Sequence, residues 1–140
     1  MAEPGTVKTL RPAAALAAAG AFTASPSAPV KPSTRAATLL VTFTRGSTSS
    51  AFALRVEESP DNTTWYRQTG ADGTTALSAP NLRVNFHAIE FRSPVPASND
   101  PIYLSIPIAL AGAKYVRVSV AEYGDTGNPG TLAVSLVEGE

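Results

Sequence analysis

The chain has 140 residues, in which eleven Lys and Arg residues balance eleven Asp and Glu residues, with one His and no Cys. The missing Cys excludes disulfides and thiolate metal sites, and the lack of a basic excess argues against a nucleic-acid partner. No apolar run approaches the roughly 20 residues that a membrane-spanning helix needs, so we expect one domain and no membrane partner.

Residues 1–35 are rich in Ala, Pro, Ser and Thr, and prolines recur every three residues within 26–32, which favours extended backbone. The alanine run at 13–19 would give a helix of only about two turns before Gly20, which is marginal. This run also mimics the apolar part of a secretory signal, but it is nearly all alanine, so we expect it to be retained. We therefore predict an extended N-terminal arm, followed by a folded domain at 36–140.

Residues 39–44 and 52–57 place large apolar side chains at every second position, which predicts two strands. The Gly- and Ser-rich turn at 46–50 lies between them, so we expect the two strands to pair as a hairpin. A Pro-Asp turn at 59–62 then leads into residues 63–69, whose β-branched and aromatic side chains predict a third strand.

Residues 82–86 continue the alternation, but the apolar positions at 89–91 are out of phase with it, as a β-bulge would produce. Residues 102–108 also alternate, and their internal proline predicts an edge strand or a strand end. The last two strands are expected at 114–121 and 132–136. Short alternating strands separated by turns predict an all-β fold, a two-sheet antiparallel β-sandwich of jelly-roll type.

Few side chains could carry a reaction. His87 lies in a predicted strand, and with no Cys and no second His a zinc site is excluded. The adjacent Glu57 and Glu58 point to opposite faces of a strand and cannot act together as acid and base. Glu90 and Glu122 could meet in space as the paired carboxylates of a glycosidase, although no motif selects them.

Four aspartates lie in turns that are rich in Gly, Asn or Pro: Asp61, Asp72, Asp100 and Asp125. Calcium prefers oxygen-rich loops, but the spacing matches no EF-hand. A turn aspartate ordinarily bonds to nearby backbone N–H groups. We therefore expect no metal ion and no other cofactor.

The aromatic residues have two interpretations. Trp65 and Tyr66 are adjacent in the predicted third strand, so one must face outward. We favour Trp65 as a core anchor with Tyr66 at the rim, because a Trp brings a large apolar area to a core. The alternative is a sugar-stacking platform that also includes Tyr103, Tyr115 and Tyr123.

Two stretches carry a resemblance. Residues 55–67 read RVEESPDNTTWYR, which is similar to the strand, S-x-D-G-x-x-W turn and strand of many tailed-phage structural proteins, with Asn62 at the usual glycine. Residues 114–136 read KYVRVSVAEYGDTGNPGTLAVSL, which is similar to the last strand pair of the same proteins. Residues 10–46 match their N-terminal half loosely. The chain thus resembles the β-sandwich cement, or head-decoration, proteins of tailed phages, podophages in particular.

The resemblance implies a non-enzymatic protein that is made in the host cytoplasm and resides in the virion. It would bind the outer surface of the capsid and join neighbouring major capsid protein subunits, often as a dimer or trimer. From the residues themselves we expect the arm to dock on a neighbour through Val7, Leu10, Leu16 and Phe22. In that case, deleting residues 1–24 would leave a folded domain that no longer binds shells.

Two other functions stay open at this point. The first is a carbohydrate-binding or host-recognition module of a phage tail or a secreted protein, which requires Trp65, Tyr66 or Tyr123 to be exposed on one platform. The second is a hydrolase that uses Glu90 and Glu122. We consider the hydrolase the least favoured of the three.

Overall fold

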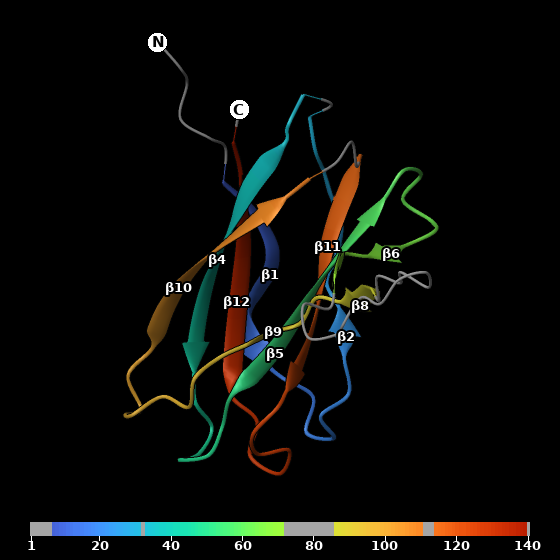
Figure 1. The fold of residues 1–140 in the computed structure, drawn as a ribbon. Helices are drawn as coiled ribbons and strands as arrows, with labels where there is room; N and C mark the ends of the chain where they lie inside the picture. The colour runs from blue at the N-terminus through green and yellow to red at the C-terminus, as the bar shows by residue number, and fades with distance from the viewer. Residues whose placement is uncertain (1–6, 32, 72–85, 111–113, 140) are drawn as a thin grey trace, which may run out of the picture.

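The computed structural model describes residues 7–31, 33–71, 86–110 and 114–139. These residues form two antiparallel sheets that pack against each other (Figure 1). None of them lies in a helix of the length and apolar character that crossing a membrane requires. The predicted all-β, two-sheet sandwich is confirmed.

Four long strands make up the first sheet, in the order β1–β12–β4–β10. Their bounds are β1 (Val7–Ala15), β12 (Thr131–Gly139), β4 (Ala36–Thr44) and β10 (Ile102–Ala109). The second sheet has two long strands at its centre and short strands on both sides. The central strands are β11 (Tyr115–Glu122) and β5 (Phe52–Ser59), with β2 (Thr23–Ala24) and β3 (Ala28–Pro29) beside β11, and β6 (Tyr66–Arg67) and β9 (Phe91–Arg92) beside β5. A separate ribbon pairs β7 (Thr69–Ala71) with β8 (Phe86–Ala88).

The predicted hairpin between the first two alternating strands is wrong. β4 pairs with β12 and β10, whereas β5 pairs with β11 in the opposite sheet. The chain crosses the sandwich between them, and Phe43 and Phe52 meet edge to face in the interior with ring centroids 5.1 Å apart. The crossing sets the apolar face of each strand against the other, which buries both faces at once.

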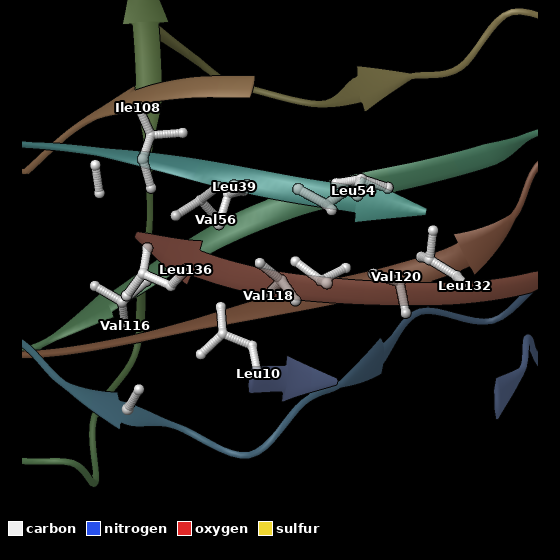
Figure 2. Packing of buried hydrophobic residues seen from close by; sticks show 14 of the residues in the cluster. Leu10, Leu39, Leu54, Val56, Ile108, Val116, Val118, Val120, Leu132 and Leu136 are labelled. Atoms are coloured by element: carbon white, nitrogen blue, oxygen red, sulfur yellow. The ribbon is translucent and has the colours of Figure 1, made fainter. Parts of the chain in front are cut away.

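Alternate side chains of both sheets form one core (Figure 2). Leu39 and Leu136 of the first sheet and Leu54, Val116 and Val118 of the second are fully buried. Burying one such side chain contributes about 1.5–3 kcal/mol. The core accounts for a stable domain without disulfides or metal ions.

The N-terminal segment is extended, but it is not separate from the sandwich. β1 pairs with β12 from Val7 opposite Val137 to Ala15 opposite Thr131, and β2 and β3 pair with β11. Leu10 and Leu16 belong to the core, with 1% and 4% of their surface exposed. Cutting the chain at 35/36 would therefore divide both sheets, and deleting residues 1–24 would remove the edge strands β1 and β2 and two core side chains.

The expected third strand at 63–69 starts later than predicted and is divided in two. The Oδ1 of Asp61 accepts hydrogen bonds from the backbone N–H groups of Thr63 and Thr64, both at 2.9 Å, so the turn extends to Thr64. Tyr66–Arg67 then pair with β5, and Thr69 begins β7. Asn62 has a φ of 62°, the left-handed conformation that glycine and asparagine adopt most readily. A glycine at this position would adopt the same backbone conformation without strain. Most of the strand expected at 82–86 lies outside the described residues.

Candidate functional site

The two outer faces of the sandwich differ in chemistry. The outward positions of the first sheet carry only small, hydroxyl, aliphatic and phenolic side chains. We call this surface the uncharged face; it comprises Val7, Thr9, Thr38, Leu40, Thr42, Thr44, Tyr103, Ser105, Pro107, Ala109, Thr131, Ala133, Ser135 and Val137. These residues come from all four strands, and none of them carries a charged side chain at neutral pH.

Two basic residues of β1, Lys8 and Arg11, lie beside this face. Lys8 Nζ turns to the other side of the sheet, where it lies 2.8 Å from Glu138 Oε2 and donates to the carbonyl of Pro29. Arg11 Nη2 folds back onto the carbonyls of Ala14 and Ala15 at 3.1 and 3.0 Å. Lys8 is therefore paired with a carboxylate, whereas Arg11 is held by backbone carbonyls and keeps its positive charge beside the face.

The uncharged face has a projection near one end and a hollow near the other. Tyr103 is 77% exposed, the largest exposed fraction among the large apolar side chains of the described residues. A shallow hollow of about 420 Å³ is lined by residues 36–38, 107–109 and 137–139. All of these residues come from three adjacent strands of the first sheet and none from the second sheet, so the hollow opens outward.

The outer face of the second sheet carries paired arginines and aromatic rings. The guanidinium carbon of Arg55 lies 3.7 Å from the ring centroid of Phe22, and that of Arg117 lies 4.3 Å from the ring centroid of Trp65. The third pair is Arg92 and Tyr123, at 4.2 Å. We call this surface, which comprises Phe22, Arg55, Trp65, Arg92, Arg117 and Tyr123, the Arg–aromatic face. Tyr66 is not part of it, because it pairs with Glu58, whose side of β5 is opposite to that of Glu57.

Two glutamates neutralise much of this positive charge. Glu90 bridges Arg55 and Arg92, with N···O distances of 3.0 and 2.6 Å, and Glu57 lies 3.4 Å from Arg117. Burial raises the pKa of Glu90, but the hydrogen bonds from Arg92 and Arg55 outweigh that effect and hold the pKa below its ordinary value. Glu90 therefore stays ionised near neutral pH and is unsuited to act as a general acid.

Glu122 is a buried structural carboxylate with 3% of its surface exposed. Its Oε1 accepts hydrogen bonds from Ser50 Oγ and the backbone N–H of Gly130, and its Oε2 accepts from the backbone N–H groups of Ala51, Gly124 and Asp125. Burial raises the pKa of Glu122, but these donors lower it by more, so the net shift is downward. Glu122 and Glu90 have separate sets of partners, and neither set leaves a carboxylate poised for proton transfer.

Asp61 and Asp125 accept hydrogen bonds within their own turns, and Asp125 also accepts one from another loop. The Oδ1 of Asp61 accepts from Ser59 Oγ as well as from backbone N–H groups. Asp125 accepts from the backbone N–H groups of Gly127 and Asn128, and from Ser47 Oγ of the β4–β5 loop at 2.7 Å. No group of three His, Asp or Glu side chains that could hold a metal ion occurs within the described part of the chain. Asp72 and the side chain of His87 lie outside it.

The four residues expected to contact a partner fall in three places. Leu10 and Leu16 lie in the protein's own core, where no partner can reach them while the sandwich is closed, because β1 pairs with β12. Val7 is 60% exposed on the uncharged face. Phe22 lies beneath Arg55 on the Arg–aromatic face. Only Val7 and Phe22 are therefore placed to contribute to a surface.

The sequence interpretation missed the role of the arginines and misplaced Trp65. Trp65 is half-buried against Arg117 on the outside of the second sheet and does not belong to the core cluster. The alternation of each strand could have indicated this surface, because Arg55 and Arg117 occupy positions that alternate with the buried apolar residues. No protein-family model matches the chain, and no curated protein is similar to it.

Proposed function

We propose that the protein is a non-enzymatic cement protein, which binds the outer surface of a phage capsid and joins neighbouring major capsid protein subunits in the virion. The resemblance of residues 55–67 and 114–136 to tailed-phage structural proteins supports this proposal. The left-handed Asn62 adds to it, because the residue occupies the glycine position of the related turn with the required backbone conformation.

The observation that carries the proposal is the Arg–aromatic face. Arg, Trp and Tyr are the residues most enriched at the centres of protein interfaces, where a few of them supply most of the binding free energy. Tyr123 is 51% exposed, so it presents a ring and a hydroxyl to a partner. The aromatic rings and Glu90 already hold the arginines in place, which lowers the entropy lost on docking.

The carboxylates support a role in binding over one in catalysis. Glu90 is ion-paired to two arginines, and Glu122 accepts hydrogen bonds at both oxygens from the surrounding loops. Each group therefore has a structural task that accounts for its position. These structural roles of Glu90 and Glu122 favour a protein that functions by binding a partner through its outer surfaces.

A carbohydrate-binding module is the second candidate, because exposed tyrosines also stack on sugars. Tyr66 and Tyr123 favour it. The placement of Trp65 does not, since the guanidinium of Arg117 covers one face of its ring at 4.3 Å. A glycan-array signal that disappears in Tyr66→Ala would support this candidate over the capsid.

Co-sedimentation with capsid shells that lack the protein tests the proposal. The wild type should sediment with the shells, and Tyr123→Ala and Arg92→Gln should each lower the affinity about tenfold or more, as central interface residues do. Ser105→Ala, on the other side of the sandwich, is the matched control and should bind as the wild type does. Wild-type protein that stays in the supernatant, or variants that bind unchanged, would refute it.

A further inference from the structure

We infer that the uncharged face is the contact surface between two copies of this chain, related by a two-fold axis. The inference is independent of the capsid proposal, which concerns the opposite side of the sandwich. It is drawn from the charge, the symmetry and the extent of the face.

Charge restricts what can cover this surface. A partner with charged side chains would lose their hydration on docking and gain no ion pair in return, which is costly. The residues of the uncharged face offer hydroxyl and apolar groups only. A second copy offers the same groups, so docking the two faces strips water from no charged side chain of the uncharged face. The acid that lines the hollow, Glu138, is already buried and is held by Lys8, Thr34 and the backbone N–H of Lys31.

The arrangement of residues along β10 and β4 matches a two-fold axis. The row of Ser105, Leu40 and Ser135 lies midway between the row of Tyr103 and Thr42 and the hollow at residues 107–109. An axis that lies in the interface along this central row sets β10 of one copy antiparallel to β10 of the other. The end of the face that carries Tyr103 then lies over the end of the other copy that carries the hollow.

This symmetry brings the projection over the hollow. Tyr103 and Pro107 are four residues apart on β10, or about 13 Å along the strand. Rotation about the central row places Tyr103 of each copy above the hollow of the other, where Thr38 supplies a hydroxyl and all other lining residues except the buried Glu138 are apolar. Leu40, which is 43% exposed, meets Leu40 of the second copy near the axis. The contact is isologous, with each surface complementary to itself.

The area of the face is sufficient for such a dimer. Strands about 4.8 Å apart that rise about 3.3 Å per residue give four strands of about eight residues a footprint of roughly 500 Å² per copy. The total of roughly 1,000 Å² reaches the lower limit for a specific interface. Sheets with the usual twist pack well face to face at about −30°, which suits two copies of one sheet. We therefore expect a dimer that dissociates on dilution.

Sedimentation equilibrium over a concentration series tests the inference. The wild type should show a monomer–dimer equilibrium, and Leu40→Lys should raise its dissociation constant roughly 100-fold or more, because two lysines would face each other near the axis. Tyr103→Ala should raise it about tenfold by leaving the hollow unfilled. Thr48→Lys, on an exposed loop away from the face, is the matched control and should leave the constant unchanged.

Chemical cross-linking provides a second readout that does not depend on affinity. Because the chain has no Cys, a short bis-maleimide should join two copies of Leu40→Cys but not two copies of Thr48→Cys. A wild type that is monomeric at the highest concentrations, or a dimer that Leu40→Lys leaves intact, overturns the inference. A monomeric wild type whose Leu40→Lys variant loses shell binding also overturns it, and assigns the face to the capsid.

Discussion

Replacing Glu122 by Gln tests how far this buried carboxylate stabilises the fold. Its two oxygens receive hydrogen bonds from Ser50 and Gly130 on one side and from three backbone N–H groups on the other. The single carbonyl oxygen of Gln can serve only one of these sets. The amide NH₂ group then faces the donors of the other set, and two or three buried donors lose their acceptor.

The loss can be estimated from these unsatisfied donors. Each buried donor without an acceptor costs about 1–3 kcal/mol, so we expect Glu122→Gln to lower the free energy of unfolding by roughly 3 kcal/mol. An unfolding entropy of about 2.1 cal/mol/K per residue over 140 residues converts this loss to a fall in melting temperature of roughly 10 °C. Thermal unfolding followed by circular dichroism at pH 7 measures the fall.

The effect should depend on pH in one direction. The folded-state pKa of Glu122 lies below its ordinary value of 4.5, because the donors outweigh the opposing effect of burial. The carboxylate therefore stabilises the fold fully above the ordinary pKa, and its contribution is lost as the pH falls through the folded-state pKa. The gap between wild type and variant should be full at pH 7 and should narrow below about pH 4.

Asp100→Asn is the matched control, since it removes a carboxylate charge at an exposed turn. Its melting temperature should stay within about 2 °C of the wild type, as for most surface substitutions. If Glu122→Gln also melts within that margin, or if its gap to the wild type is the same at pH 3.5 and pH 7, the structural role assigned to Glu122 is refuted.

Three further predictions concern the N-terminal segment and the turn before Trp65. Leu10→Ala should lower the free energy of unfolding by about 2–5 kcal/mol in urea titrations, because Leu10 is 1% exposed. Val7→Ala, at a 60% exposed position, should change the free energy of unfolding by less than about 0.5 kcal/mol. Equal effects of the two substitutions would contradict the pairing of β1 with β12. A chain that lacks residues 1–24 should unfold at a clearly lower urea concentration than the full chain, and an unchanged midpoint would show that β1 is dispensable. Asn62→Gly should melt within a few degrees of the wild type. Asn62→Val should lower the free energy of unfolding by about 1–2 kcal/mol, because valine is strained at a left-handed φ. A valine variant as stable as the wild type would contradict the turn geometry.

Period-two alternation was enough to predict the long strands after residue 36 and the faces they bury. Leu39, Val41 and Phe43 point inward as the pattern indicated, and Pro107 lies on an edge strand, where its missing N–H costs least. The partners of these strands were not predictable in the same way. Alternation shows which side of a strand is apolar, but it does not show to which of the two sheets the strand belongs. The sequence therefore predicts a hairpin where the chain crosses from β4 in one sheet to β5 in the other.

The N-terminal segment shows a different limit. Its prolines and alanines correctly indicated extended backbone, but a strand with small exposed side chains at residues 12–15 carries no clear alternation. The pairing of β1 with β12 joins the two ends of the chain, with Val7 opposite Val137. Contacts over such a separation leave no local signal, and Leu10 and Leu16 were read as surface anchors for that reason.

The two candidate surfaces depend on register, which is why the sequence suggested neither. Arg117 lies directly opposite Glu57, and Arg55 reaches Glu90 across a distance of 35 positions in the chain. The uncharged face becomes visible only when four strands from both ends of the chain are set side by side. Once the register is known, the alternating polar positions of β4, β10 and β12 explain it directly.

Cryo-electron microscopy of capsid shells incubated with the purified protein tests the central claim most directly. We predict density for the sandwich on the outer surface, with the Arg–aromatic face turned toward the capsid subunits and across a boundary between them. Shells that remain bare at saturating protein, or density in which Arg92, Arg117 and Tyr123 point away from the shell, would contradict the account.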